Sequence, residues 1–110
     1  YIKQVALAAF SNVRDGGLNA LTLAEDDVLV GAELMAPGAD IILASALGQA
    51  VRFNESTVRV SLRGSGMMRG MTLSDMDTLV GMQVCVDDKA QVLTVSSLGV
   101  GKITNLGNFV

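Results

Sequence analysis

Two stretches of this chain, LTLAEDDVLVGAEL at residues 21–34 and MTLSDMDTLVGMQV at residues 71–84, are copies of one pattern. A threonine, a leucine, an aspartate and the run Leu-Val-Gly recur at the same places, offset by 50 residues. A second pair, IILASALG at residues 41–48 and VLTVSSLG at residues 92–99, is offset by 51 residues because the turn DDKAQ carries one extra residue. A period near fifty residues is typical of propellers and other repeat arrays.

The segments inside each repeat are short and rich in Val, Leu, Ile, Thr and Met, with Gly, Asp or Asn between them. This pattern predicts short β-strands joined by turns. The predicted strands include residues 28–34, 41–46, 50–53 and 58–62, and hairpin turns are predicted at Pro37–Asp40 and Val86–Ala90. Residues 1–10 could form a helix, but they occupy a place where the other repeats have strands. The predicted fold class is therefore all-β.

The predicted architecture is a β-propeller-like array with roughly four strands per repeat, the usual content of one blade. The repeats cover about residues 1–47 and 48–98, and a third begins at residues 99–110. A propeller typically closes with four to eight blades, and an open array exposes strand edges that pair with other chains. We therefore expect a fragment of a larger ring, or a chain that associates with copies of itself.

The composition restricts which kinds of protein this chain can be and which cell compartment suits it. The 110 residues are half hydrophobic, carry a net charge of −3, and include one cysteine and no histidine. A single cysteine excludes an internal disulfide and favours the cytoplasm, and no apolar run is long enough to cross a membrane or act as a signal peptide. The negative net charge by itself argues against nucleic acid as a partner.

The sequence contains no constellation that would make an independent enzyme. Adjacent carboxylates such as Asp26 and Asp27 point to opposite faces of a strand, so they cannot flank one bond. GSGMMRG at residues 64–70 lacks the third glycine of a dinucleotide site, and GVGK at residues 99–102 lacks the first glycine and the hydroxyl residue of a P-loop. AEDDV does not have the ligand spacing of a calcium loop. We therefore predict no catalytic, metal-binding or cofactor-binding residue in this chain.

The basic residues occupy recurring places in the repeat instead of forming one run. Lys3, Arg52 and Lys102 lie near the start of a repeat, and Arg14 and Arg63 precede the glycine-containing segments DGG and GSG. If successive blades are rotated copies, such positions form a periodic positive track that suits a phosphate backbone. The candidate DNA-binding residues are Lys3, Arg14, Arg52, Arg63, Arg69 and Lys102. Charge alone favours a simpler interpretation, in which these are ordinary solvated side chains on strands.

Motifs along the chain resemble those of a known family. They are a head, YIKQV or GQAVRF; a body, RGSGMMRGMTL followed by LVGM; and a tail, LTVSSLGVGKIT. The chain is similar to the C-terminal domain of the A subunit of DNA gyrase, whose repeats carry a Gly-Tyr-x-Lys-Arg head, an Arg-x-x-Arg-Gly-x-x-Gly-Ile/Met-x-Leu body with a downstream aspartate, and a Leu-x-x-Ser/Thr-x-x-Gly tail. The resemblance covers both repeats and rests on many weakly specific positions at consistent spacing.

The resemblance implies a β-pinwheel of about six blades, with strands exchanged between neighbouring blades, that wraps double-stranded DNA around a basic perimeter. This wrapping would support ATP-dependent negative supercoiling by the whole type IIA topoisomerase. Lys3, Arg52 and Lys102 match head positions, while Arg63 and Arg69 match the body arginines, so the resemblance implies that they contact phosphates. Arg14 is a weaker match because RDGGLNAL lacks the second body arginine.

The resemblance also implies what lies outside this chain. The catalytic tyrosine, the Mg²⁺ site and the ATP site belong to other domains, so no cofactor is expected here. The implied partners are DNA, the other gyrase domains and the ATPase subunit, in the bacterial cytoplasm with the nucleoid.

Two alternatives remain open. NVRDGGLN at residues 12–19 echoes the basic, glycine-rich box of the first gyrase blade only faintly. This departure indicates later blades or weaker wrapping, and it keeps the related subunit of topoisomerase IV as an alternative. A propeller that binds proteins without affinity for DNA is the alternative from another class.

Overall fold

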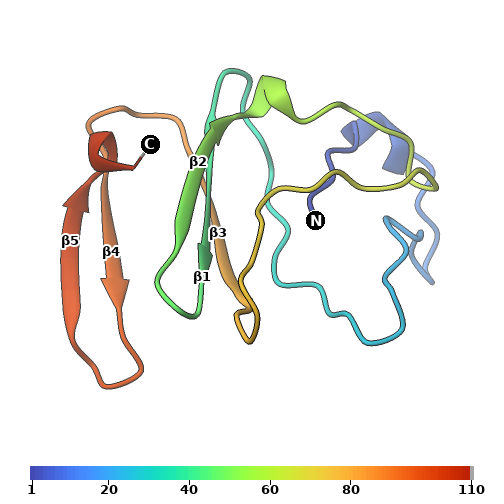
Figure 1. The fold of residues 1–110 in the computed structure, drawn as a ribbon. Helices are drawn as coiled ribbons and strands as arrows, with labels where there is room; N and C mark the ends of the chain where they lie inside the picture. Colours follow the sequence, from blue (N-terminus) through green and yellow to red (C-terminus); the bar gives the residue numbers. More distant parts are fainter. Residues whose placement is uncertain (110) are drawn as a thin grey trace.

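The computed structural model describes residues 1–109, and the regular elements of this part are five β-strands and three short 3-10 helices (Figure 1). The elements, in chain order, are η1 (Leu7–Phe10), β1 (Asp40–Ser45), β2 (Ala50–Asn54), η2 (Glu55–Thr57), β3 (Leu79–Cys85), β4 (Gln91–Val95), β5 (Gly101–Asn105) and η3 (Leu106–Asn108). The predicted all-β class is confirmed. Within the described residues, no helix has the length and apolar character needed to span a bilayer.

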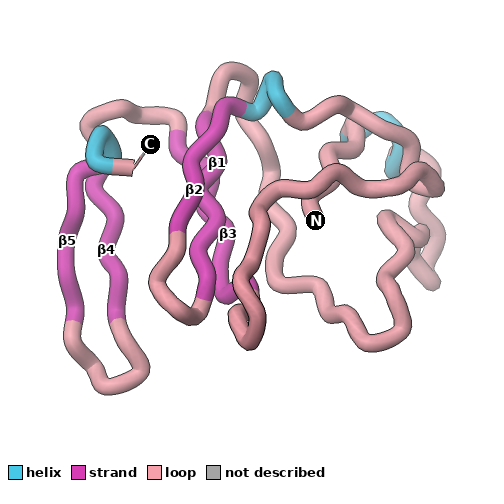
Figure 2. Tube along the Cα trace, in the orientation of Figure 1, coloured by secondary structure: helices cyan, strands magenta, loops and turns pink. Residues whose placement is uncertain are grey.

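The strands form two antiparallel sheets. One sheet has the order β2-β1-β3, and the other is the hairpin β4-β5. Strand β1 lies in the centre of the first sheet, where Ile42 is opposite Arg52 on one side and Gln83 on the other. Figure 2 shows that most of the chain before β1 is loop.

The core lies against the central strand β1. Ile41 and Leu43 are buried on one face of this strand, as the period of two requires, and they pack with Val58. Partly buried apolar side chains from several parts of the chain surround this cluster: Ile2, Met35, Val51, Phe53, Met68, Met71, Leu79 and Met82. The first sheet therefore draws its core from both repeats.

The two hairpins have the same turn, which confirms the repeat with an offset of 51 residues. The Ser45 amide donates to the Gln49 carbonyl at 2.8 Å, and the Ser96 amide donates to the Val100 carbonyl at 2.9 Å. Both turns contain a glycine in the left-handed region, Gly48 with φ 90° and its counterpart Gly99 with φ 84°. Glycine adopts this conformation without the steric cost that a Cβ would bring.

Strand β3 crosses between repeats. By sequence it belongs to the second repeat, but it pairs with β1 of the first, whereas β4 pairs with β5. The predicted hairpin at Val86–Ala90 is therefore wrong, because this segment connects two different sheets. The turn at Pro37–Gly38 is present, but it precedes β1 without a paired strand before it.

The sheets also have fewer strands than the predicted four per repeat. Residues 28–34 do not form a strand, although their copy in the second repeat is β3. Residues 58–62 contribute only an isolated bridge between Val60 and Gln4, and the N-terminal segment adds one between Ile2 and Met68. A strand forms only where a neighbouring strand can pair with its backbone N–H and C=O groups. The pattern of side chains along one segment does not show whether such a neighbour is present.

Asp77 fixes the crossing strand to the first hairpin. Its Oδ1 accepts the Leu47 amide at 3.0 Å and the Thr78 amide at 2.9 Å, and its side chain is nearly buried. The Ser45 side chain, followed by the amides of Leu47, Thr78 and Ala46, holds the pKa of Asp77 below its ordinary value of 3.8. Asp77 is therefore a junction between the turn of the first hairpin and the strand β3 of the next repeat.

Gly70, at the end of the body motif, is required by packing. A Cβ at this position would lie 2.9 Å from Leu43 Cδ1 and 3.1 Å from Ile2 Cγ2. Leu43 is part of the buried cluster, so it has little room to move.

We expect Gly70→Ala to lower the free energy of unfolding by about 1–3 kcal/mol, because the added methyl group overpacks the core. Gly64→Ala is the matched control, since a Cβ there meets nothing within 4 Å. Urea unfolding followed by circular dichroism measures both. Equal stability of the two variants would contradict the packing role.

We expect the stability to fall in acid through Asp77. Its pKa is lowered in the fold, so its contribution is complete above the ordinary value of 3.8 and is lost as the pH falls through the lower, folded value. Asp77→Asn should lower the melting temperature at pH 7 and should flatten its decline below about pH 4. A melting temperature whose acid dependence is the same in wild type and variant would contradict this role.

Candidate nucleic-acid interface

The six candidate DNA-binding residues do not lie together in the described part of the chain. Lys3 and Arg63 lie beside one another near the N-terminal segment, whereas Arg52 and Lys102 are on β2 and β5. Figure 1 places β5 on the opposite side of the three-stranded sheet from the N-terminal end. Lys102 therefore lies on the other side of the three-stranded sheet from Lys3 and Arg63.

Lys3 and Arg63 hold loops together. The Lys3 ammonium donates to the carbonyls of Arg63 and Ser65, the latter at 2.8 Å. The Arg63 guanidinium donates to the Asn19 carbonyl at 2.9 Å and lies over the Phe10 ring, 5.9 Å from its centroid. Both side chains are half-buried, so part of their hydrogen-bonding capacity is already used.

Arg14 and Arg69 extend from loops into solvent. Arg14 precedes a turn in which the Gly17 amide donates to the Arg14 carbonyl at 2.8 Å, and Gly17 has φ 79°. Arg69 follows Met68, whose backbone forms the bridge with Ile2. Both residues are exposed, so both guanidinium groups are accessible to a phosphate.

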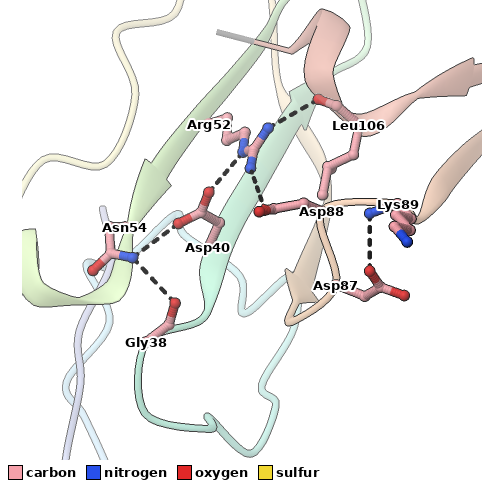
Figure 3. A network of polar contacts seen from close by, with 8 residues as sticks. All are labelled: Gly38, Asp40, Arg52, Asn54, Asp87, Asp88, Lys89 and Leu106. Atoms are coloured by element: carbon pink, nitrogen blue, oxygen red, sulfur yellow. Dashed lines mark hydrogen bonds and ion pairs between the residues drawn. The ribbon is translucent and has the colours of Figure 1, made fainter.

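Arg52 is engaged inside the protein (Figure 3). Its Nε donates to Asp40 Oδ2 at 2.7 Å, its Nη1 donates to the Leu106 carbonyl at 3.0 Å, and its Nη2 is 3.6 Å from Asp88 Oδ1. The side chain is only 18% exposed. Hydrogen bonds from Asn54 and Arg52 lower the pKa of Asp40, so this carboxylate stays ionised at neutral pH. The network connects the first sheet to the segment that carries η3.

Arg52 and Lys102 are not equivalent positions of the repeat. With the two hairpins aligned at Ser45 and Ser96, Arg52 corresponds to Ile103, while Lys102 corresponds to Val51. Neighbouring positions of a strand face opposite sides, so the two basic side chains do not continue one track. The distance from the glycine at the start of a repeat groups these residues together. Arg52 is four residues after Gly48 but Lys102 is three residues after Gly99, so this grouping does not reveal the difference in register.

Lys102 is exposed on β5, opposite Thr94. Two further basic residues, Arg59 and Lys89, are also exposed, although the sequence pattern did not place them among the six candidates. Arg59 lies in the segment after η2 where polar and apolar residues alternate, and this alternation could have identified it as an exposed residue. Lys89 follows Asp87 and Asp88, and the acidic character of this turn gave no indication of a basic site.

The other titratable groups do not assemble a reactive site. Within residues 1–109, no cluster of three or more His, Cys, Asp or Glu side chains could hold a metal ion. Burial raises the pKa of the Cys85 thiol, which keeps it protonated and poorly nucleophilic. The chemistry that the arrangement offers is the binding of anions by exposed Arg and Lys side chains.

The family match and the similar proteins indicate the same family. Residues 1–34, 39–85 and 90–110 match the family described as DNA gyrase C-terminal domain, beta-propeller. The chain is 36% identical over 110 residues to the A subunit of DNA gyrase from Haloquadratum walsbyi, covering 99% of this chain and 13% of that protein. It is 38% identical over 108 residues to the A subunit of DNA gyrase from Pseudomonas aeruginosa, covering 98% of this chain and 12% of that protein.

The chain thus spans about an eighth of the length of these relatives. The match covers both repeats, and a β-propeller agrees with the all-β fold of the described residues. The chain belongs to the DNA gyrase C-terminal domain family, whose fold is a β-propeller.

Proposed function

We propose that this chain binds and wraps double-stranded DNA without sequence preference, as part of the C-terminal domain of a gyrase A subunit. The observation that carries the proposal is the set of exposed basic side chains, Arg14, Arg69 and Lys102, on a fold of this family. Phosphate contacts depend on charge and not on base identity, so they suit a wrapping surface. The net charge of −3 is compatible with this role if the acidic residues gather at turns away from the DNA.

The rest of the proposal concerns the parent protein. The parent would be a type IIA topoisomerase that introduces negative supercoils with ATP hydrolysed by its partner, the ATPase subunit. Its catalytic tyrosine and the sites for Mg²⁺ and ATP would lie in other domains. The chain described here would be non-catalytic and without a cofactor, and it would work in the cytoplasm with the nucleoid.

The six candidate residues would contribute unequally. Exposed Arg14, Arg69 and Lys102 can reach a phosphate with no rearrangement, whereas Lys3 and Arg63 would have to share their present contacts. Arg52 would have to exchange Asp40 or a carbonyl for a phosphate. The exposed group would therefore supply most of the salt-dependent binding.

A titration with salt tests the proposed function. Fluorescence anisotropy of a labelled duplex of about four helical turns should report binding whose logarithm falls linearly with log salt, with a slope of about −0.9 for each phosphate neutralised. If the chain were a propeller that binds only proteins, it would not bind the duplex even at low salt. Absence of duplex binding at low salt would overturn the proposal. The related topoisomerase IV chain would share this slope, so a supercoiling assay of the parent protein separates these two.

Lys102→Gln should reduce the magnitude of the salt slope by about 1 and weaken binding equally on different duplex sequences. Lys89→Gln is the control, because it removes the same charge from an exposed residue outside the candidate set. Anisotropy titrations of both variants, side by side, make the comparison. If both reduce the slope equally, the effect is net charge and Lys102 is not a contact.

Arg52→Gln should lower the free energy of unfolding by about 1–2 kcal/mol, because it removes charge-assisted hydrogen bonds to Asp40 and the Leu106 carbonyl. The salt slope should change by much less than it does in Lys102→Gln. Chemical unfolding and the DNA titration measure the two effects. Unchanged stability with a slope reduced by about 1 would make Arg52 a phosphate contact instead.

A further inference from the structure

The two sheets of the described chain are joined by one connecting segment and by few polar contacts. No strand of the hairpin β4–β5 pairs with a strand of the described sheet β2-β1-β3. Residues 86–90 carry the chain from β3 to β4. A connecting segment can rotate about the φ and ψ angles of each of its residues, so contacts between the two sheets must fix how they are oriented.

Arg52 makes every hydrogen bond and ion pair that joins residues 86–109 to the preceding chain in the described structure (Figure 3). Its Nη1 donates to the Leu106 carbonyl at 3.0 Å, and its Nη2 is 3.6 Å from Asp88 Oδ1. The remaining polar contacts of the hairpin stay within the hairpin, such as the bond from the Leu106 amide to the Ala90 carbonyl at 3.1 Å. Arg52 is thus the polar link between the two sheets.

The first sheet holds the Arg52 guanidinium in place for this contact. Its Nε donates to Asp40 Oδ2 at 2.7 Å, and Asn54 donates to Asp40 Oδ1 at 2.9 Å and to the Gly38 carbonyl at 3.2 Å. The guanidinium is planar and rigid, so a bond through Nε also fixes the direction of Nη1. The donor that meets Leu106 is therefore oriented by β1 and β2.

Burial shows which of the two contacts of Arg52 is the stronger. Leu106 is 1% exposed, and Ile42, which lies opposite Arg52 across the sheet, is 5% exposed. A charge-assisted hydrogen bond in such surroundings is stronger than one in water. The Asp88 side chain is 98% exposed, so its ion pair contributes little. The bond to the Leu106 carbonyl therefore carries most of the link.

The second hairpin shows that a hairpin of this kind does not need the Arg52–Asp40 pair. Ile103 takes the place of Arg52 in β5, and Gln91 takes the place of Asp40 in β4. Gln91 donates instead to Asn105 Oδ1 at 3.0 Å, and the hairpin keeps the same register. The pair in the first hairpin therefore acts outside that hairpin, at the junction with the second sheet.

The exposed basic residues assigned to phosphate contact lie on both sides of this link. Arg14 and Arg69 belong to the chain before it, whereas Lys102 is on β5 after it. A duplex that contacts all three needs them at fixed separations. Binding that must first immobilise a loose joint loses affinity, and a joint that is already fixed avoids this loss.

We propose that Arg52 is a positioning residue, which holds the hairpin β4–β5 at a fixed angle to the first sheet and so aligns Lys102 with Arg14 and Arg69 on one duplex. The effect on DNA rests on the proposed function, whereas the fixed angle is measured without DNA. This role differs from the phosphate contact that the sequence pattern predicted for Arg52.

Arg52→Lys separates positioning from charge. One ammonium group cannot occupy the places of both Nε and Nη1, so it cannot bind Asp40 and the Leu106 carbonyl as the guanidinium does. It keeps the positive charge, and a lysine binds phosphate as a point charge. Arg59→Lys is the matched control, since Arg59 is exposed and its side chain makes no hydrogen bond within the described residues. Asp88→Asn is a second control, because it removes only the exposed ion pair.

Pulsed EPR measures the angle between the two sheets. The spin labels are attached at Gln49→Cys and Ser97→Cys, exposed positions in the turns of the two hairpins, with Cys85→Ser to remove the native thiol. The labelled wild type and both controls should give one narrow distribution of distances. Arg52→Lys should give a broader distribution, because the link that fixes the angle is lost, while its circular dichroism stays like that of wild type.

Fluorescence anisotropy with the labelled duplex of about four helical turns measures the effect on DNA. Arg52→Lys should bind about tenfold more weakly than wild type, because the hairpin must be immobilised on binding. Its salt slope should stay the same, since the same phosphates are neutralised. Affinity that falls while the slope is kept distinguishes a positioning residue from a phosphate contact.

Three results would overturn the proposal. They are a distance distribution of Arg52→Lys as narrow as that of wild type, equal duplex affinity of Arg52→Lys and Arg59→Lys, and a salt slope reduced by about 1 in Arg52→Gln with an unchanged distance distribution. A wild-type chain that binds no duplex would overturn the proposed function, and the distance distributions would still decide whether Arg52 fixes the angle between the sheets.

Discussion

The pairing of β3 with β1 is the interaction on which the rest of this structure depends. A strand of the second repeat completes the sheet of the first, and it brings Met82 and Leu79 to the core around Ile41 and Leu43. Asp77 fixes the approach by binding the turn amide of Leu47. The first sheet is therefore not built from one repeat, because its third strand comes from the next repeat along the chain. This property gives repeat proteins their additive stability and leaves unpaired edges wherever a neighbour is absent.

The distribution of charge follows from the same construction. The two hairpins have the same register. Basic side chains of successive repeats therefore lie on the same face only if they occupy the same position in their hairpins. Arg52 and Lys102 differ by one place, and this shift leaves an internal ion pair and an exposed lysine where two equivalent phosphate contacts were expected. The exposed basic residues belong to loops and to β5, where they are available to a polyanion. The internal arginine instead connects the first sheet to η3, through the Leu106 carbonyl.

The chain spans about an eighth of the gyrase A subunits that it matches. The proposal therefore assigns phosphate contacts to this chain, and it assigns the chemistry on DNA strands, which needs a nucleophile and metal ligands, to other domains of the parent. A charged perimeter can bend and hold DNA without such groups, because counterion release supplies the free energy. The proposed division of labour follows from this difference in chemistry.

The sequence alone determined the repeat, the all-β class and the family, because these depend on local periodicity and on motifs at consistent spacing. The strands predicted at residues 41–46 and 50–53 are β1 and β2, but the hairpin turns were predicted at Pro37–Asp40 and Val86–Ala90 and not at the turns that join β1 to β2 and β4 to β5. Only the tertiary structure decided that β3 joins β1 and not β4, because strand pairing is a contact between segments far apart in the chain. It also decided that Arg52 is held by Asp40 while Lys102 is exposed to solvent. The reason is that a side chain can reach a ligand only if its face of the strand is open to solvent. A shift of one residue along the strand moves a side chain to the opposite face, where its neighbours differ.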